Sequence, residues 1–561
     1  MDVMSPMFFI SLPIEVILEL LKYLNTSDIL SLRQTCTYLA EVSKDRLIWH
    51  DLVQEQRTRL PLPPNARGNL EAWSTDALES LVISNELVDD LWLIPRETPP
   101  VKLQNRRGEL LLGLEIFADR WILAVYMDGY MDLWDAESPN EDRRWCFVYT
   151  GNDKTTSFKV AQDETEDKLL VVITRAHLPG TWVAVLYEVL LSESPSKLQF
   201  IPLRTFSISS SRVARQIYIR ERIIVFSQLG LIELAQWSED SKDVIRSTVL
   251  ASNIQSDELE EMFTTILSLR ILSDHYIFVF KTRSIELYPI THSASPSVPP
   301  PFLPSLRHVF PSYSFRDVQI AEVESETLTE EESSSSGYDG TRYALKMLAS
   351  DVIQGLFYFV ANITIPSARH EQFHPPILDV HLAAVYAMAN HIPLYSRAHQ
   401  RQRNTLQTSR SSHAAVHDRA VQKRLSTPRS NSVNSVRSSS FVSTYALGPQ
   451  GMRAVWIERR RGSTWKQIVS CRLNPSSSNG QEMISDLNLE MWNSDSSEEE
   501  NSINQDGNFD FITQALDGHI IYSVQSYDLR EDITFCALGE VSGKIVLGNR
   551  SGDVFILDTG V

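Results

Sequence analysis

Apolar positions near the start of the chain recur with the period of an α-helix. Five of them share one side of a helix that opens after Pro13, namely Ile14, Ile17, Leu18, Leu21 and Leu24. The polar run from Asn25 to Asp28 has the side chains that cap helix starts, so a second helix is expected there. This second helix would carry Ile29, Leu30 and Leu32.

Shorter amphipathic segments follow the two predicted helices. One runs from Cys36 to Val42 and another from Leu47 to Leu52. Together these helices make a core of only about forty residues, which is small for an independent domain. We therefore expect a partner or a flanking domain to complete it.

The next stretch divides into an irregular part and a helix. Residues Gln54 to Arg67 contain three prolines and predict an irregular connector. A helix is then expected between a cap at Ser74 and a stop at Pro95. Such a helix serves either as a rigid spacer or as an element that packs on the next domain, and both interpretations stay open.

From about Leu110 the helical period gives way to short apolar runs separated by turn residues. The segments Ile122–Asp135 and Ile545–Asp558 align without gaps, with Gly129 opposite Gly552, and each predicts two strands joined by a tight turn. Similar segments begin at Ile223 and Tyr276. The spacing of about 50 residues predicts a β-propeller with one four-stranded blade per repeat.

The number of blades follows from placing these repeats along the chain. Four blades fit before Ile290. Three more are expected from Leu345–Ile365, from Ile377–Ala389 joined to Tyr445–Leu473, and from Phe511–Asp558. About seven blades are predicted, with six or eight as alternatives and a pair of β-sandwiches as the rival fold. The match between the first and last repeats favours a ring closed through the C-terminal strand.

Two segments resemble known families. The Leu12-Pro13 start, the Ile17 to Leu24 stripe, the Leu32 to Cys36 run and Leu47-Ile48-Trp49 resemble an F-box in order and spacing. The strand ending Leu133-Trp134-Asp135 resembles a WD repeat, although no blade has the full Gly-His to Trp-Asp signature. A helical hairpin whose apolar residues are all internal core is the alternative to the F-box, but helix periodicity does not require the Leu-Pro start or the terminal tryptophan.

The F-box resemblance implies a partner and a binding surface. F-box domains dock the Skp adaptor of cullin-RING ubiquitin ligases. The residues that the resemblance assigns to adaptor binding are Leu12, Pro13, Ile17, Leu20, Leu24, Ile29 and Leu32.

The predicted fold class is an α+β multidomain protein, with a small helical F-box followed by an all-β propeller. The expected parts are a tail at 1–10, the F-box-like domain at 11–53, a connector with a helix at 54–109, and the propeller-like domain at 110–561. Low-complexity insertions of the propeller are expected at about 291–304, 322–340, 395–440 and 474–508. Their composition predicts disordered loops.

The insertion at 395–440 is rich in arginine and serine, and a solvated loop is favoured over a nuclear-import or nucleic-acid patch because no aromatic residues are interleaved. Ser426 and Thr427 in this loop are candidate phosphorylation sites, since added negative charge beside arginines orders a loop.

Composition restricts the partners. The chain has 561 residues, 43% of them apolar, and a net charge of -19, which argues against nucleic acid and anionic membranes as main partners. Its four cysteines are far apart and support neither a disulfide scaffold nor a zinc site. With no apolar run long enough to span a membrane, a cytoplasmic or nuclear location is expected.

No catalytic motif, cofactor fingerprint or metal-ligand spacing was recognised in the sequence, and the expectation is a protein with no cofactor, metal or small-molecule substrate. His370 and His374 lie four positions apart, at i and i+4, but the prolines that follow break a helix that would align them. The leading hypothesis is a non-catalytic substrate receptor of an SCF-type ubiquitin ligase, in which the F-box docks the Skp adaptor and the cullin scaffold and the propeller binds an unidentified target protein. The alternatives are an F-box scaffold that acts outside ubiquitin ligation and a propeller enzyme.

Overall fold

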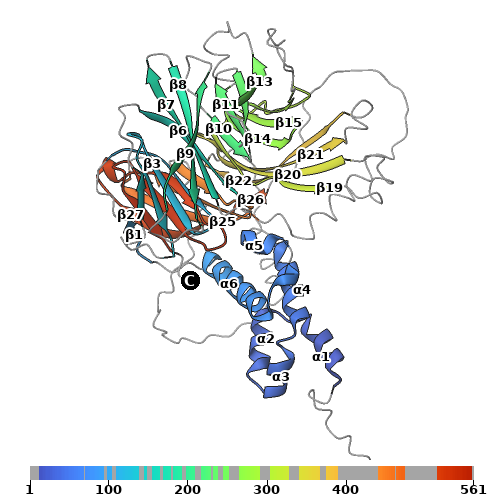
Figure 1. Ribbon diagram of the computed structural model, residues 1–561. Helices are drawn as coiled ribbons and strands as arrows, with labels where there is room; N and C mark the ends of the chain where they lie inside the picture. Colours follow the sequence, from blue (N-terminus) through green and yellow to red (C-terminus); the bar gives the residue numbers. More distant parts are fainter. Residues whose placement is uncertain are drawn as a thin grey trace, which may run out of the picture.

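The protein is described here by a computed structural model. It describes residues 12–558 apart from 69, 94–97, 104–108, 138–143, 148–153, 164–167, 179–180, 192–197, 209–215, 221, 229–230, 238–243, 252–264, 291–303, 328–339, 367–374, 389–439, 461–462 and 474–513. A group of helices at the N-terminal end projects from a larger all-β part (Figure 1). The helices are α1 (Ile14–Leu21), α2 (Thr26–Arg33), α3 (Thr37–Val42), α4 (Arg46–Arg57), α5 (Pro64–Arg67), the 3₁₀ turn η2 (Leu70–Ala72) and α6 (Thr75–Leu93).

The caps and boundaries of the first helices follow the sequence pattern. Helix α1 begins directly after Pro13, and the side chain of Asn25 accepts a hydrogen bond from the Asp28 amide at 2.8 Å at the start of α2. The stretch predicted as an irregular connector is partly helical, because α4 continues to Arg57 and α5 begins at Pro64.

Helix α6 completes the small helical core. Leu78, Leu81 and Val82 of α6 are buried in one cluster with Ile17 of α1 and Trp49 of α4. Polar contacts add to this packing, since Arg33 of α2 forms a two-pronged ion pair with Glu79 of α6 at 2.5 and 3.1 Å. The expected need for a flanking element is therefore met by the chain itself.

The second half of α6 packs on the β-structure. Trp92 is fully buried among strand residues that include Val455 and Ile468. Asp89 forms ion pairs with Arg453, at 3.2 Å, and with Arg472. Both open interpretations of this helix are thus correct, because one half belongs to the helical core and the other half is fixed to the propeller.

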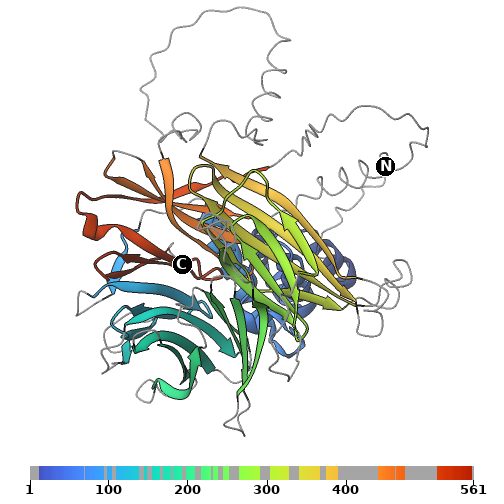
Figure 2. The same cartoon turned by 90° about the horizontal axis from the view of Figure 1, so that it is seen from above.

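The all-β part is a seven-bladed propeller, which confirms the predicted fold class (Figure 2). Blades 1 to 4 are regular four-stranded sheets. Their strands are β2 (Leu111–Phe117), β3 (Trp121–Tyr126), β4 (Met131–Asp135) and β5 (Arg144–Phe147); β6 (Thr155–Asp163), β7 (Lys168–Leu178), β8 (Thr181–Leu190) and β9 (Ile201–Ile208); β10 (Gln216–Arg220), β11 (Ile223–Gln228), β12 (Leu231–Trp237) and β13 (Val244–Ala251); and β14 (Ile266–Ser273), β15 (Tyr276–Lys281), β16 (Ser284–Pro289) and β17 (Leu306–Val309).

Blades 5 to 7 are assembled from strands with long sequence separations. Their strands are β18 (Asp317–Ile320), β19 (Glu324–Thr327), β20 (Gly340–Asp351), β21 (Gly355–Pro366), β22 (Ile377–Ala387) and β26 (Gln514–Ala515); β23 (Ser440–Leu447), β24 (Arg453–Arg460), β25 (Trp465–Arg472) and β27 (His519–Gln525); and β28 (Ile533–Leu538), β29 (Ile545–Asn549), β30 (Val554–Leu557) and β1 (Val101–Leu103).

The composition of blades 5 and 6 corrects the sequence prediction. The prediction that joined Ile377–Ala389 to Tyr445–Leu473 in one blade is wrong, because β22 pairs with β21 along most of its length and belongs to blade 5. The fourth strand of blade 6 is β27, which pairs with β25 and lies within the segment predicted as the last blade.

The ring is closed by a strand from each end of the propeller. β30 at the C-terminal side pairs with β1, so Val101 lies opposite Ile556 and Leu103 opposite Val554. Ring closure was expected through the C-terminal strand, with the propeller starting at residue 110. The structure adds a three-residue strand from the preceding stretch, which completes blade 7.

The two faces of the propeller differ. In each blade, the first strand ends and the second strand begins at the same end of the sheet, and the third strand also ends there. This end of the propeller faces the helices (Figure 1). The amide of Leu62, between α4 and α5, donates to the side chain of Gln450 at 3.0 Å, and Arg67 of α5 pairs with Glu322. We call this end the helix face, and the opposite end, with the connections between second and third strands, the far face.

Candidate functional site

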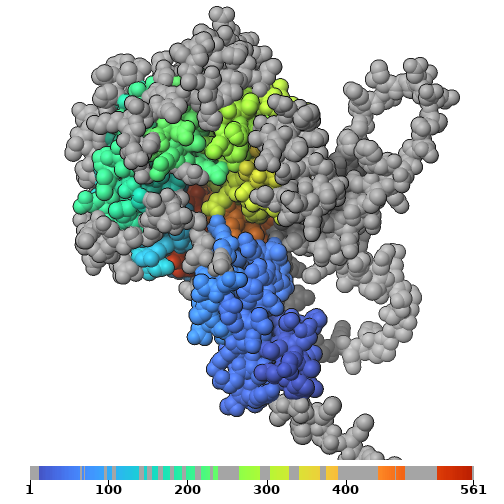
Figure 3. Space-filling model, turned by 45° about the vertical axis from the view of Figure 1, so that its right-hand side comes forward, coloured from blue at the N-terminus to red at the C-terminus, as the bar shows by residue number. Residues whose placement is uncertain are grey.

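An exposed apolar stripe lies on α1, in the part of the helical domain that projects away from the propeller (Figures 1 and 3). Pro13, Val16, Leu20 and Tyr23 follow one another at intervals of three and four residues, which places them on one side of the helix. Val16 and Leu20 are 43% and 42% exposed, and Tyr23 just after the helix is 80% exposed. We call these four residues the α1 stripe. Clustered exposed apolar side chains mark interaction surfaces.

The seven predicted adaptor-binding residues divide between surface and core. Pro13 and Leu20 are exposed, and Leu12, Leu24 and Leu32 are partly buried against the helical core.

Ile17 and Ile29 are fully buried in the helical core. Both side chains pack in the core cluster to which α3, α4 and α6 also contribute, and neither is accessible to a partner in this arrangement.

Two residues of the α1 stripe were absent from the sequence prediction. Val16 and Tyr23 lie beside the predicted apolar positions of α1, but on the side turned away from the core. The helical period could have identified both residues, because Val16 lies four positions before Leu20 and Tyr23 three positions after it. Ile14, Tyr38 and Leu47 are further exposed apolar residues of this domain.

The far face carries the glycine turns of the strand–turn–strand repeats. Gly129 and Gly552 have φ angles of 90° and 87°, a conformation that favours glycine, and each joins the second and third strands of its blade. The turns therefore lie at the end of the propeller opposite the helices, while the Gly230 turn lies outside the described residues.

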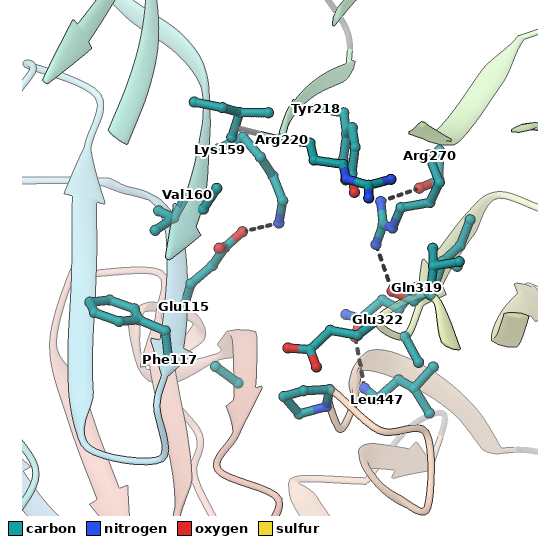
Figure 4. Close-up of a pocket in the computed structure, with 18 of the residues that line it drawn as sticks. Glu115, Phe117, Lys159, Val160, Tyr218, Arg220, Arg270, Gln319, Glu322 and Leu447 are labelled. Carbon is teal, nitrogen blue, oxygen red and sulfur yellow. Dashed lines mark hydrogen bonds and ion pairs between the residues drawn. The ribbon is translucent and has the colours of Figure 1, made fainter. Parts of the chain in front are cut away.

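The central channel of the propeller is a cavity of about 1030 Å³ (Figure 4). It is lined by the innermost strand of each blade and, at the helix face, by Arg67. Figure 4 shows the Glu115 carboxylate turned toward Lys159 and the Arg270 guanidinium turned toward the neighbouring blade.

Polar side chains in and around this channel join neighbouring blades. Lys159 binds Glu115 at 2.6 Å, Arg220 donates to the Ile271 and Leu272 carbonyls, and Arg270 donates to the Ile320 carbonyl at 2.6 Å. The side-chain amide of Gln319 forms two hydrogen bonds to the backbone of the next blade. Its nitrogen donates to the Tyr445 carbonyl, and its oxygen accepts from the Leu447 amide. These contacts join neighbouring blades around the ring.

Two carboxyl groups, the partly buried Asp119 and the fully buried Glu540, complete this set of contacts around blade 7. Asp119 accepts hydrogen bonds from the amides of Val541 and Ser542 at 2.8 and 3.1 Å, and burial raises its pKa. Glu540 is fully buried and accepts hydrogen bonds from the amides of Gln450, Met452 and Arg453 at 2.5 to 2.8 Å. Burial raises the pKa of Glu540 to about 7, against the three amide donors, which lower it.

Within the described ranges, no group of three or more histidine, cysteine or acidic side chains is arranged to hold a metal ion. His370 and His374 lie outside those ranges, as do Ser426 and Thr427. In the same part of the chain, no helix is both long and apolar enough to cross a membrane. The buried tryptophans Trp121 and Trp134 lie in the cores of blade 1 and its neighbours.

Comparison with known families supports the assignment of the helices. Residues 9–55 match the F-box-like family model. No curated protein sequence matches the chain.

Solved β-propellers resemble the chain at low identity. The β-propeller domain of Cps50 (Swd1) from Myceliophteria thermophila is 8% identical, with 82% of this chain and 99% of that chain covered and a TM-score of 0.41. The WD40 domain of SCAP from fission yeast is also 8% identical, with 81% and 85% covered and a TM-score of 0.35. The assignment of the fold as a propeller therefore follows from the seven four-stranded or larger sheets and not from these similarities.

Proposed function

We propose that this protein is a substrate-receptor subunit of an SCF-type ubiquitin ligase. An F-box-like domain followed by a WD40-type propeller fits an F-box substrate receptor in general, which is a typical non-catalytic architecture. In the proposal, the helices dock a Skp adaptor and, through it, a cullin-RING scaffold, while the propeller binds a target protein for ubiquitination in the cytoplasm or nucleus.

The observation that carries the proposal is the α1 stripe. Its apolar side chains are exposed, lie within the F-box-like match and are turned away from the core that Ile17 anchors. Exposed apolar residues at i, i+3 and i+7 on one helix provide the anchors that a partner surface buries.

The fixed junction between helices and propeller supports the receptor role. Trp92, Asp89 and Gln450 fasten the helical domain to the helix face, so the far face points away from the adaptor end. A receptor performs no bond chemistry, and it acts by holding its target in one orientation and at a high effective concentration near the ubiquitin carrier.

The proposal is tested by affinity purification of the full chain followed by mass spectrometry of adaptor and cullin. The parent is compared with Leu12→Ala/Pro13→Ala and with Leu20→Asp, with Leu87→Asp as the matched control because Leu87 is a similarly exposed leucine on α6. Adaptor and cullin are expected with the parent and with Leu87→Asp and to be lost from the other two variants, while thermal melting shows that each variant is folded.

Two other outcomes contradict the proposal. Recovery of adaptor without cullin would indicate an F-box scaffold that acts outside ubiquitin ligation. Recovery of neither partner with the parent chain would remove the receptor role altogether.

A further inference from the structure

A small cavity of about 200 Å³ lies on blade 6, near the far face. It is lined by Ser440, Glu458, Arg460, Ser463, Trp465 and Gln467, from the start of β23, the end of β24 and the start of β25. Pockets for whole small molecules are commonly about 300 to 1,000 Å³, so this one is the size for a single side chain.

Glu458 supplies a nearly buried carboxylate to this cavity. Its residue is 8% exposed, and it accepts a hydrogen bond from the Tyr386 hydroxyl at 2.5 Å. Among the described residues, no lysine, arginine or histidine forms an ion pair with Glu458. Arg460 lines the same cavity but forms no ion pair with Glu458, so the carboxylate makes the cavity favourable for a cation.

Trp465 adds a second feature that attracts a cation. It lines the same cavity and is 51% exposed, so part of its surface is open to solvent. The face of an indole ring attracts ammonium and guanidinium groups. The net charge of -19 of the whole chain adds a long-range attraction for basic partners.

We propose that this cavity binds a lysine or arginine side chain of the target protein, with Glu458 as counter-ion and Trp465 as aromatic wall. This proposal rests on the proposed function, because it assumes that the partner is a target protein. It adds the chemical class of the side chain that the target presents. Arg460 lines the cavity and is exposed, so its like charge weakens binding.

The test uses the full chain and capped pentapeptides Gly-Ser-Xaa-Ser-Gly in which Xaa is lysine, arginine, norleucine or glutamate. Saturation-transfer NMR is suitable because it detects weak ligands of large proteins. The lysine and arginine peptides are expected to bind and the norleucine and glutamate peptides to give no signal. Glu458→Gln is expected to weaken binding about tenfold or more, and Trp465→Ala about threefold to tenfold.

Two further variants distinguish binding at this cavity from long-range charge attraction and from damage to the fold. Glu109→Gln removes one exposed negative charge elsewhere on the propeller and is expected to leave binding unchanged. Arg460→Ala removes the like charge and is expected to strengthen binding about twofold, a gain that damage to the fold does not produce.

Equal binding of the lysine and norleucine peptides would overturn the proposal, because recognition would then be apolar. Equal losses in Glu458→Gln and Glu109→Gln would also overturn it, because they indicate long-range attraction alone. The proposed function is judged independently by adaptor recovery, which Glu458→Gln is expected to leave intact since Glu458 lies on the propeller and the α1 stripe on the helices.

Discussion

At the scale of single residues, Glu540 of blade 7 joins blades 6 and 7 through three hydrogen bonds to its carboxylate. Its carboxylate accepts hydrogen bonds from the amides of Gln450, Met452 and Arg453; Glu540 and Arg453 are buried, and Gln450 and Met452 are partly buried. Glu540→Ala leaves three amide donors without a partner. We expect it to destabilise the propeller by about 3 kcal/mol or more, measured as a lower melting temperature. Glu109→Ala, at an exposed position, serves as the control, and equal melting of the two variants would contradict this role.

Glu286 of blade 4 gives a pH-dependent prediction. Burial raises its pKa, but the Lys281 ammonium at 2.6 Å and hydrogen bonds from Tyr288 and Ser284 outweigh burial, so the pKa is lowered overall. A carboxyl with a lowered folded-state pKa adds stability that is complete above its ordinary pKa and is lost as the pH falls through the folded value.

Glu286→Gln removes this contribution and leaves Lys281 without its counter-charge. At neutral pH we expect a loss of about 3 kcal/mol. The difference in melting temperature from the parent should shrink as the pH falls below the ordinary value for glutamate. A difference that stays constant between pH 7 and pH 3 would contradict the assignment.

The helical period in the sequence identified the apolar residues of α1, but it did not show which of them are buried and which are exposed. Helical period alone places Ile17 and Leu20 on the same broad side of the helix. Ile17 is turned into the core and Leu20 to solvent because α3, α4 and α6 pack on one flank of this side, and that packing involves residues as distant as Leu81. The pattern of apolar residues within one helix does not reveal contacts with residues so distant in the sequence.

At the scale of elements, α6 is the connection that fixes the helical domain on the propeller. Arg453 is almost completely buried, and Asp89 is its carboxylate partner at 3.2 Å. We expect Asp89→Ala to increase hydrogen exchange in the last two turns of α6 and at the start of β24, because it leaves a buried cation unpaired. Exchange in α1 to α4 should stay unchanged.

The neighbouring Asp90 provides the matched control for this experiment. Asp90 is exposed on the same helix, so Asp90→Ala removes the same charge without touching Arg453. Unchanged exchange in Asp89→Ala, or an equal change in both variants, would show that the ion pair does not hold the junction.

The strand–turn–strand repeats were predictable, whereas the composition of the later blades was not. Repeats such as Ile122–Asp135 contain their own turn, and the glycine at its centre marks it in the sequence. A long insertion follows β22 and another precedes β27, so chain order does not say which sheet each strand joins. β1 has only three residues, too few for a period to be recognised.

At the scale of the whole molecule, the protein is a projecting helical domain held on one face of a closed ring (Figures 1 and 3). The proposed receptor function assigns the adaptor to the α1 stripe and the target to the far face. These two surfaces lie on opposite sides of the α6 junction, so binding at one leaves the other open.

The most direct test of this account is a titration of the purified full chain with purified Skp adaptor, comparing the parent with Leu20→Asp and Leu87→Asp. We expect the parent and Leu87→Asp to bind equally well. Leu20→Asp should bind about thirtyfold more weakly or worse, because the loss of one buried anchor costs about 2 kcal/mol or more. Equal binding by Leu20→Asp, or no binding by the parent, would contradict the assignment of the α1 stripe as the adaptor-binding surface.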